Sequence, residues 1–148
     1  MNTAITTLGI EHSVLSKYDE LFDRNPLIIK SPGRINLIGE HTDYNGGFVM
    51  PAAIDKGIVF AIGRAQTGAS SLHSQKYEET IQINNSNPEQ VKSPAWANYL
   101  LGVVARLKQE GIEIPTFNCV FHGDLPTGAG LSSSAAVECG FIFGLNEL

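Results

Sequence analysis

The stretch PTGAGLSSSAAV at residues 126–137 constrains the fold more than any other part of the sequence. Directly before it, apolar and polar side chains alternate over residues 116–122, which predicts a strand. Directly after it, from about Ser132, an apolar segment predicts a helix. The chain is therefore expected to form a strand, a glycine-rich turn and a helix start in immediate succession.

That arrangement suits a phosphate group, because N–H groups in the first turn of a helix have no partner within the helix. Gly128 and Gly130 let the backbone approach an anion closely, and Ser132, Ser133 and Ser134 add hydroxyl groups, one of which can ligate Mg²⁺. The Lys-Ser/Thr ending of a Walker A loop and the third glycine of a dinucleotide fingerprint are both missing. From spacing alone, a phosphate-binding loop and a plain loop with a serine cap both remain open.

A second group of chemically active residues lies in RINLIGEHTDYNGG at residues 34–47. Glu40, His41 and Asp43 are close together after an apolar segment, and carboxylates there can accept hydrogen bonds from sugar hydroxyls. Arg34 suits a transferring phosphoryl group, whose oxygens fit its planar guanidinium. The alternatives are that Asp43 only braces the following turn and that Arg34 only pairs with Glu40. A metal site is the weaker interpretation, since adjacent residues of an extended chain point opposite ways.

The remaining sequence predicts a mixture of helices and strands. Apolar spacings of three and four predict a helix over residues 11–24 and a clearer one over residues 93–111, with Ser93 as cap and Gly111 at its exit. Strands are expected over residues 27–30, 34–39, 57–64 and about 77–83, with an interruption at 31–33, a reversal at 45–47 and the polar segment SSLHSQ between the last two strands. The order predicts an α/β (α+β) fold in which helices pack on a mixed sheet.

Composition and charge narrow the classes of function. The 148 residues suit one domain or a fragment, and 43% hydrophobic with 17% charged residues is ordinary for a soluble globular protein. The net charge of −5 argues against a nucleic-acid partner. The absence of a signal peptide or a long apolar span predicts a cytoplasmic protein without a membrane partner. Cys119 and Cys139 have apolar neighbours and are expected to be buried free thiols.

Two separate motifs resemble one family. GRINLIGEHTDYN at residues 33–45 closely resembles the galactokinase signature, and PTGAGLSSSAA at residues 126–136 resembles the phosphate-binding motif of the wider GHMP small-molecule kinases. The resemblance implies a fold like the second domain of ribosomal protein S5, with a left-handed βαβ crossover. It also implies that residues 1–148 are an N-terminal GHMP kinase domain without its C-terminal domain, as the uncapped apolar ending FIFGLNEL suggests as well.

The activity that this resemblance implies is the phosphorylation of α-D-galactose at its anomeric hydroxyl, with ATP as co-substrate and Mg²⁺, to give galactose 1-phosphate in the Leloir pathway. Arg34 matches the arginine that stabilises charge during phosphoryl transfer. Glu40, His41, Thr42 and Asp43 match the segment that binds galactose.

The nucleotide site is implied in the same way. The residues that match the ATP-phosphate loop are Gly128, Ala129, Gly130, Leu131, Ser132, Ser133 and Ser134. Ser134 also matches the Mg²⁺ ligand, and Ser74 matches a nucleotide-contacting serine. Trp96 falls where the family has an aromatic residue near the adenine, although its place in the apolar stripe of the 93–111 helix favours the core.

The resemblance implies that the family's catalytic Asp, a Glu that holds Mg²⁺, a sugar-binding Tyr and a third glycine-rich motif belong to a part of the enzyme beyond residues 1–148. We therefore expect residues 1–148 to be inactive alone and to need the C-terminal half of the enzyme as partner. The alternatives are an N-acetylgalactosamine kinase and a non-catalytic sensor of galactose and ATP. The intact SSSAA run favours the enzyme.

Overall fold

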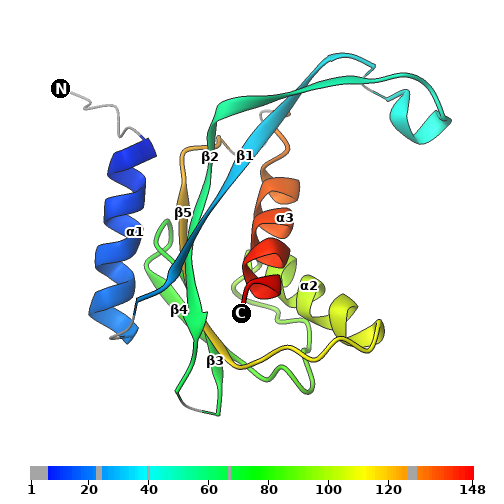
Figure 1. The fold of residues 1–148 in the computed structure, drawn as a ribbon. Helices are drawn as coiled ribbons and strands as arrows, with labels where there is room; N and C mark the ends of the chain where they lie inside the picture. Colours follow the sequence, from blue (N-terminus) through cyan, green and yellow to red (C-terminus); the bar gives the residue numbers. More distant parts are fainter. Residues whose placement is uncertain (1–6, 23–24, 40, 67, 127–129) are drawn as a thin grey trace.

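The computed structural model describes residues 7–22, 25–39, 41–66, 68–126 and 130–148 (Figure 1). The elements in chain order are α1 (Thr7–Phe22), β1 (Leu27–Ile38), the 3₁₀ helix η1 (Asp43–Asn45), β2 (Met50–Arg64), β3 (Ser70–Ser74), β4 (Glu79–Ile83), α2 (Ala97–Gln109), β5 (Phe117–Gly123) and α3 (Ser133–Asn146). The strands form one five-stranded sheet in the order β1-β2-β5-β3-β4. β3 and β5 run parallel and the other neighbours antiparallel, so the predicted mixed α/β class is confirmed.

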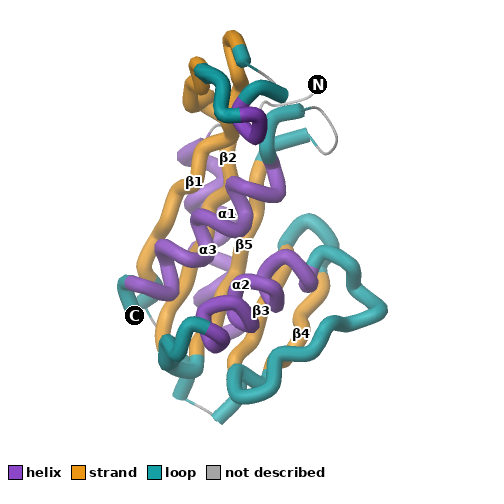
Figure 2. The backbone as a smooth tube through the Cα atoms, turned by 90° about the vertical axis from the view of Figure 1, so that its right-hand side faces the viewer, coloured by secondary structure: helices purple, strands orange, loops and turns teal. Residues whose placement is uncertain are grey.

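Helices cover both faces of the sheet: α1 lies on one face, and α2 and α3 lie on the other (Figures 1 and 2). Residues 58–62 of β2 are buried beneath helices on both faces of the sheet, which explains the apolar run GIVFAIGR. Phe60 and Ile62 point into the core beneath α2 and α3, while Val59 and Ala61 point into a smaller core beneath α1. Because successive side chains of a strand point to opposite faces of the sheet, this one apolar run contributes side chains to both cores.

The first two predicted strands are one continuous strand, so the expected interruption at residues 31–33 is wrong. Strand β1 accommodates that segment by an irregularity, where the pairing with β2 passes from Pro32–Gly57 to Arg34–Ala53. Proline and glycine weaken a regular ladder but are tolerated where the pairing is already irregular. The reversal expected at residues 45–47 does join β1 to β2.

The prediction that SSLHSQ is a connection is also wrong, because residues 70–74 form the fully buried strand β3. Two of the polar side chains of this strand have hydrogen-bond partners inside the protein. Ser70 Oγ accepts a hydrogen bond from the Phe117 N–H at 3.0 Å, and His73 Nδ1 lies 2.8 Å from Thr80 Oγ1. Since β3 pairs with β5 on one side and β4 on the other, its backbone groups are satisfied as well.

Three local predictions also need correction. Helix α1 begins at Thr7, earlier than expected. Helix α2 begins at Ala97, with Trp96 rather than Ser93 at its N-cap and no side-chain cap. Its exit is as predicted, because Gly111 adopts a left-handed φ of 76°. Both cysteines are free, but only Cys119 is buried, whereas Cys139 is exposed on α3.

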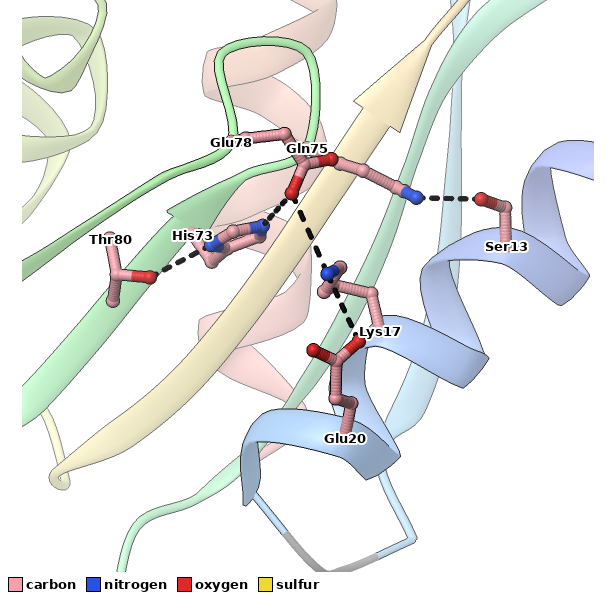
Figure 3. Close-up of polar contacts among 7 residues, drawn as sticks. All are labelled: Ser13, Lys17, Glu20, His73, Gln75, Glu78 and Thr80. Carbon is pink, nitrogen blue, oxygen red and sulfur yellow. Dashed lines mark hydrogen bonds and ion pairs between the residues drawn. The ribbon is translucent and has the colours of Figure 1, made fainter.

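Polar contacts help to attach α1 to the hairpin of β3 and β4 (Figure 3). Lys17 Nζ lies 3.0 Å from Glu20 Oε2 and 3.5 Å from Glu78 Oε2. His73, only 4% exposed, lies 3.9 Å from the same Glu78 carboxylate through Nε2. Burial lowers the pKa of His73 and outweighs the opposing effect of Glu78.

Strands β1 and β2 continue beyond the rest of the sheet as a long arm with η1 at its tip, and the arm leans toward the side that carries α2 and α3 (Figure 1). Large apolar side chains of this arm are exposed, among them Ile38 at 72% and Phe48 at 100%. The signature motif therefore lies at the end of an arm, whereas the glycine- and serine-rich turn leads into α3.

Candidate functional site

The start of α3 is the place where the sequence predicts a phosphate-binding loop. Gly130 and Ser132 adopt left-handed φ angles of 69° and 56°, and α3 begins at Ser133. The Ser132 carbonyl accepts the Ala136 N–H at 2.9 Å, so the helix ladder begins there. The N–H groups of the first turn have no acceptor within the helix, and the helix dipole adds positive potential. Gly128 and Ala129 lie outside the described residues.

A cavity of about 140 Å³ lies beside this helix start and brings together several predicted nucleotide residues. Ser133 and Ser134 line it from α3, Ser74 from the end of β3, and Trp96 from the N-cap of α2. The residues that complete the lining are Ile58, Lys76, Tyr77, Tyr99, Phe121, His122, Gly123, Leu125 and Val137. No motif in the sequence indicated Lys76, Tyr99 or Phe121 as site residues.

Two of these side chains have environments that suit a ligand. The Ser74 hydroxyl is buried and has no hydrogen-bond partner among the described residues. Buried hydroxyl groups are usually satisfied, so this one is available to a bound molecule or water. Trp96 packs edge-on against Phe121 at 5.5 Å between ring centroids, and its Nε1 donates to Glu79 Oε2 at 3.2 Å. These contacts fix the indole at the cavity wall.

The two motifs meet at the base of the arm. The Arg34 N–H donates to the Leu131 carbonyl at 3.2 Å, one residue before the N-cap of α3. At Gly33, a Cβ atom would lie 2.5 Å from Leu125 Cδ2 and 3.1 Å from the Leu131 oxygen, so only glycine fits without displacement. The exposed Arg34 side chain therefore starts from a backbone position directly beside the serine-rich turn.

The signature loop is braced by its own hydrogen bonds. Thr42 Oγ1 donates toward the Gly39 carbonyl at 2.7 Å and the Phe48 carbonyl at 3.0 Å. Thr42 thus uses its hydroxyl proton within the loop, which leaves its lone pairs for a ligand. His41 is exposed, Asp43 begins η1, and Glu40 lies outside the described residues.

The described residues contain no group of three or more His, Cys, Asp or Glu side chains that could hold a metal ion. Within the same residues, no helix is long and apolar enough to cross a membrane.

Comparisons with known proteins link both motifs to one family. The family model described as the galactokinase galactose-binding signature matches residues 16–64, and the GHMP kinases N terminal domain matches residues 98–148. The galactokinase of Staphylococcus carnosus (strain TM300) is 45% identical over 130 residues, which cover 85% of this chain and 34% of the relative. The crystal structure of Lactococcus lactis galactokinase complexed with galactose matches with a TM-score of 0.80 at 36% identity, over 93% of this chain and 37% of that one. The chain belongs to the galactokinase family.

These comparisons confirm the family resemblance that the two motifs carried. A second relative, the galactokinase of Halalkalibacterium halodurans, is 36% identical over 144 residues, covering 95% of this chain and 36% of its own length. This galactokinase-family chain therefore spans about a third of the length of the curated relatives it matches. The Methanococcus jannaschii mevalonate kinase structure, with a TM-score of 0.68 at 24% identity over 82% of this chain and 40% of that one, shows the same fold.

The two family models leave residues 65–97 unmatched, which include Ser74 and Trp96. The placement of these two side chains at a nucleotide site therefore depends on the cavity itself.

Proposed function

We propose that residues 1–148 form the N-terminal GHMP kinase domain of a galactokinase, which transfers the γ-phosphoryl group of ATP to the anomeric hydroxyl of α-D-galactose. The observation that carries the proposal is the hydrogen bond between Arg34 and Leu131, which joins the signature strand to the start of α3. The galactose bound in the Lactococcus lactis relative supports the choice of sugar.

The nucleotide base is assigned to the cavity beside α3. Trp96, Tyr99 and Phe121 supply aromatic walls, which suit a planar base. Ser74 supplies a hydroxyl group that can donate to or accept from the edge of the base. From this cavity, Ser133 and Ser134 lead to the helix start, where the triphosphate would meet the first-turn N–H groups.

The chemistry assigned to the chain is electrostatic and positional. Arg34 is proposed to neutralise negative charge that develops on the transferring phosphoryl group. The Ser134 hydroxyl is an oxygen donor of the kind that Mg²⁺ prefers, so Ser134 is proposed to hold Mg²⁺ together with phosphate oxygens. When bound, Mg²⁺ supplies charge neutralisation at the phosphates.

The sugar is assigned to the signature loop at the tip of the arm. Glu40 and Asp43 would accept hydrogen bonds from sugar hydroxyls, and His41 would donate one. Thr42 would accept only, because its proton is directed to backbone carbonyls. The arm leans toward the side of the sheet where α3 begins, which favours a sugar position facing the phosphates (Figure 1).

Residues 1–148 alone are proposed to bind but not to catalyse, because the relatives with this activity are about three times as long. The test joins this chain to the remaining part of the Staphylococcus carnosus galactokinase and measures ADP release with galactose and with N-acetylgalactosamine. We expect galactose-dependent turnover in the chimera and none in residues 1–148.

The matched control in this experiment is the Arg34→Ala chimera, which should lose about 10²- to 10³-fold in kcat, the usual cost of removing one transition-state donor. Turnover with N-acetylgalactosamine but not with galactose would show that N-acetylgalactosamine, and not galactose, is the sugar substrate. Tight binding of galactose and ATP by a chimera that never releases ADP would support a sensor and refute the kinase.

A further inference from the structure

The signature loop contains a side-chain contact that no motif assigns. His41 Nδ1 lies 2.9 Å from the hydroxyl oxygen of Tyr44. The two rings also meet edge-on, with centroids 6.0 Å apart and an interplanar angle of 67°. Tyr44 is therefore held against the imidazole both by a hydrogen bond and by ring packing.

The loop backbone beneath these rings is fixed by separate contacts. His41 adopts a left-handed φ of 70°, which is unfavourable for a residue with a Cβ atom. Asn45 Nδ2 donates to the His41 carbonyl at 2.9 Å, and the Gly47 N–H donates to the Thr42 carbonyl at 2.8 Å. These bonds position the His41 backbone, so rotation of the imidazole about its side-chain torsions is the freedom that remains.

The contact with Tyr44 restricts that rotation and also selects a tautomer. A neutral imidazole has one N–H and one acceptor nitrogen, and the partner of one nitrogen decides which is which. A phenol is a good hydrogen-bond donor, so the Tyr44 hydroxyl is expected to donate to Nδ1. The proton of the neutral ring then lies on Nε2.

We propose that Tyr44 is a positioning residue for sugar binding, which holds His41 as its Nε2–H tautomer so that Nε2 can donate to a sugar oxygen. This inference rests on the proposed function. It assigns different roles to the side chains of the loop. The carboxylates accept hydrogen bonds from sugar hydroxyl groups, while the oriented imidazole donates a hydrogen bond to a sugar oxygen. Tyr44 is 73% exposed, so packing in the core does not explain its placement.

The test measures the imidazole tautomers directly. The chain has four histidines, and long-range ¹H–¹⁵N correlation spectra of ¹⁵N-labelled protein at pH about 9 distinguish the two neutral tautomers of each. His41→Gln identifies the His41 signals by their loss. We expect a dominant Nε2–H form of His41 in the wild type and a mixture of both forms in Tyr44→Phe. The exposed His12 on α1 serves as the internal control and should not change.

A galactose titration followed in the same spectra supplies the second measurement. Loss of one hydrogen bond that orients a ligating group should weaken galactose binding about three- to tenfold in Tyr44→Phe. A dominant Nδ1–H form in the wild type, or an unchanged tautomer in Tyr44→Phe, would overturn the inference and leave the proposed function intact. Failure of galactose to perturb His41 in the wild type, with the tautomers as expected, would instead count against the proposed sugar site.

Discussion

Replacing Gly140 by alanine tests whether α3 is held against the sheet by close contact. Gly140 lies in α3, and a Cβ atom there would be 2.5 Å from Phe60 Cε2 and 2.7 Å from Ser31 Cβ. Phe60 is fully buried and stacks on Phe121 with centroids 5.7 Å apart, so its ring has little room to move. The added methyl group must therefore push α3 away from β1 and β2.

The size of the effect follows from two opposing contributions. Alanine is favoured over glycine in a helix by about 1 kcal/mol, and overpacking a close-packed core costs about 1–3 kcal/mol. Because both neighbouring atoms are nearer than 3.0 Å, we expect the cost to exceed the gain. The free energy of unfolding of Gly140→Ala should therefore fall, by up to about 2 kcal/mol.

Two other helical glycines provide matched controls for the same substitution. At Gly102 in α2, an added Cβ atom meets nothing within 4 Å, so Gly102→Ala should gain about 1 kcal/mol from helix propensity alone. At Gly144, the nearest atom is Ile62 Cγ2 at 3.0 Å, and the change should be close to neutral. Urea unfolding followed by far-UV circular dichroism ranks the three variants. If Gly140→Ala were stabilised as much as Gly102→Ala, the packing of α3 derived from the structure would be wrong.

Three further outcomes are expected. Burial lowers the pKa of His73, so the unfolded chain takes up a proton at this residue more readily than the folded protein does. The free energy of unfolding should therefore fall as the pH drops through the ordinary histidine range. Between pH 8 and pH 5, the urea midpoint should fall less in His73→Gln than in the wild type or in the exposed control His12→Gln. Trp96 is the only tryptophan of the sequence, so binding of ATP should change the intrinsic fluorescence of the protein. Trp96→Phe should retain ATP binding, whereas Trp96→Ala should weaken it about tenfold. Ser134→Ala should weaken binding of ATP in the presence of Mg²⁺ but not in the presence of EDTA; equal losses in both would remove Ser134 as a Mg²⁺ ligand.

The elements that follow a clear hydrophobic period were predictable from the sequence. The expected strand at residues 116–122 is β5, Phe117–Gly123, and the helix expected from about Ser132 is α3, Ser133–Asn146. Strand β3 was not predictable, because its side chains are mostly polar and the hydrogen-bond partner of Ser70, the Phe117 N–H, lies far along the chain. Periodicity measures how apolar a segment is, and it cannot show that a polar segment has buried partners.

The candidate site was predictable in its residue types but not in its assembly. The signature and the serine-rich turn each indicated a chemistry, and the resemblance indicated Ser74 and Trp96. Lys76, Tyr99 and Phe121 were missed because their presence in the cavity depends on tertiary contacts. For Phe121, the parallel pairing of β3 with β5 places its backbone opposite Ser74. A residue that lines a cavity but belongs to no local motif can be identified only after the strand order is known.

The distance between the two motifs depends on glycines at the base of the arm that belong to neither motif. At Gly57 in β2, a Cβ atom would lie 2.5 Å from the Ser31 carbonyl oxygen, and at Gly123 in β5 it would lie 2.5 Å from the Gly57 carbonyl oxygen. Three neighbouring strands thus approach backbone to backbone where the arm leaves the sheet. A side chain at either position would force these strands apart and shift Arg34 relative to Leu131, so glycines outside both motifs set the geometry on which phosphoryl transfer would depend.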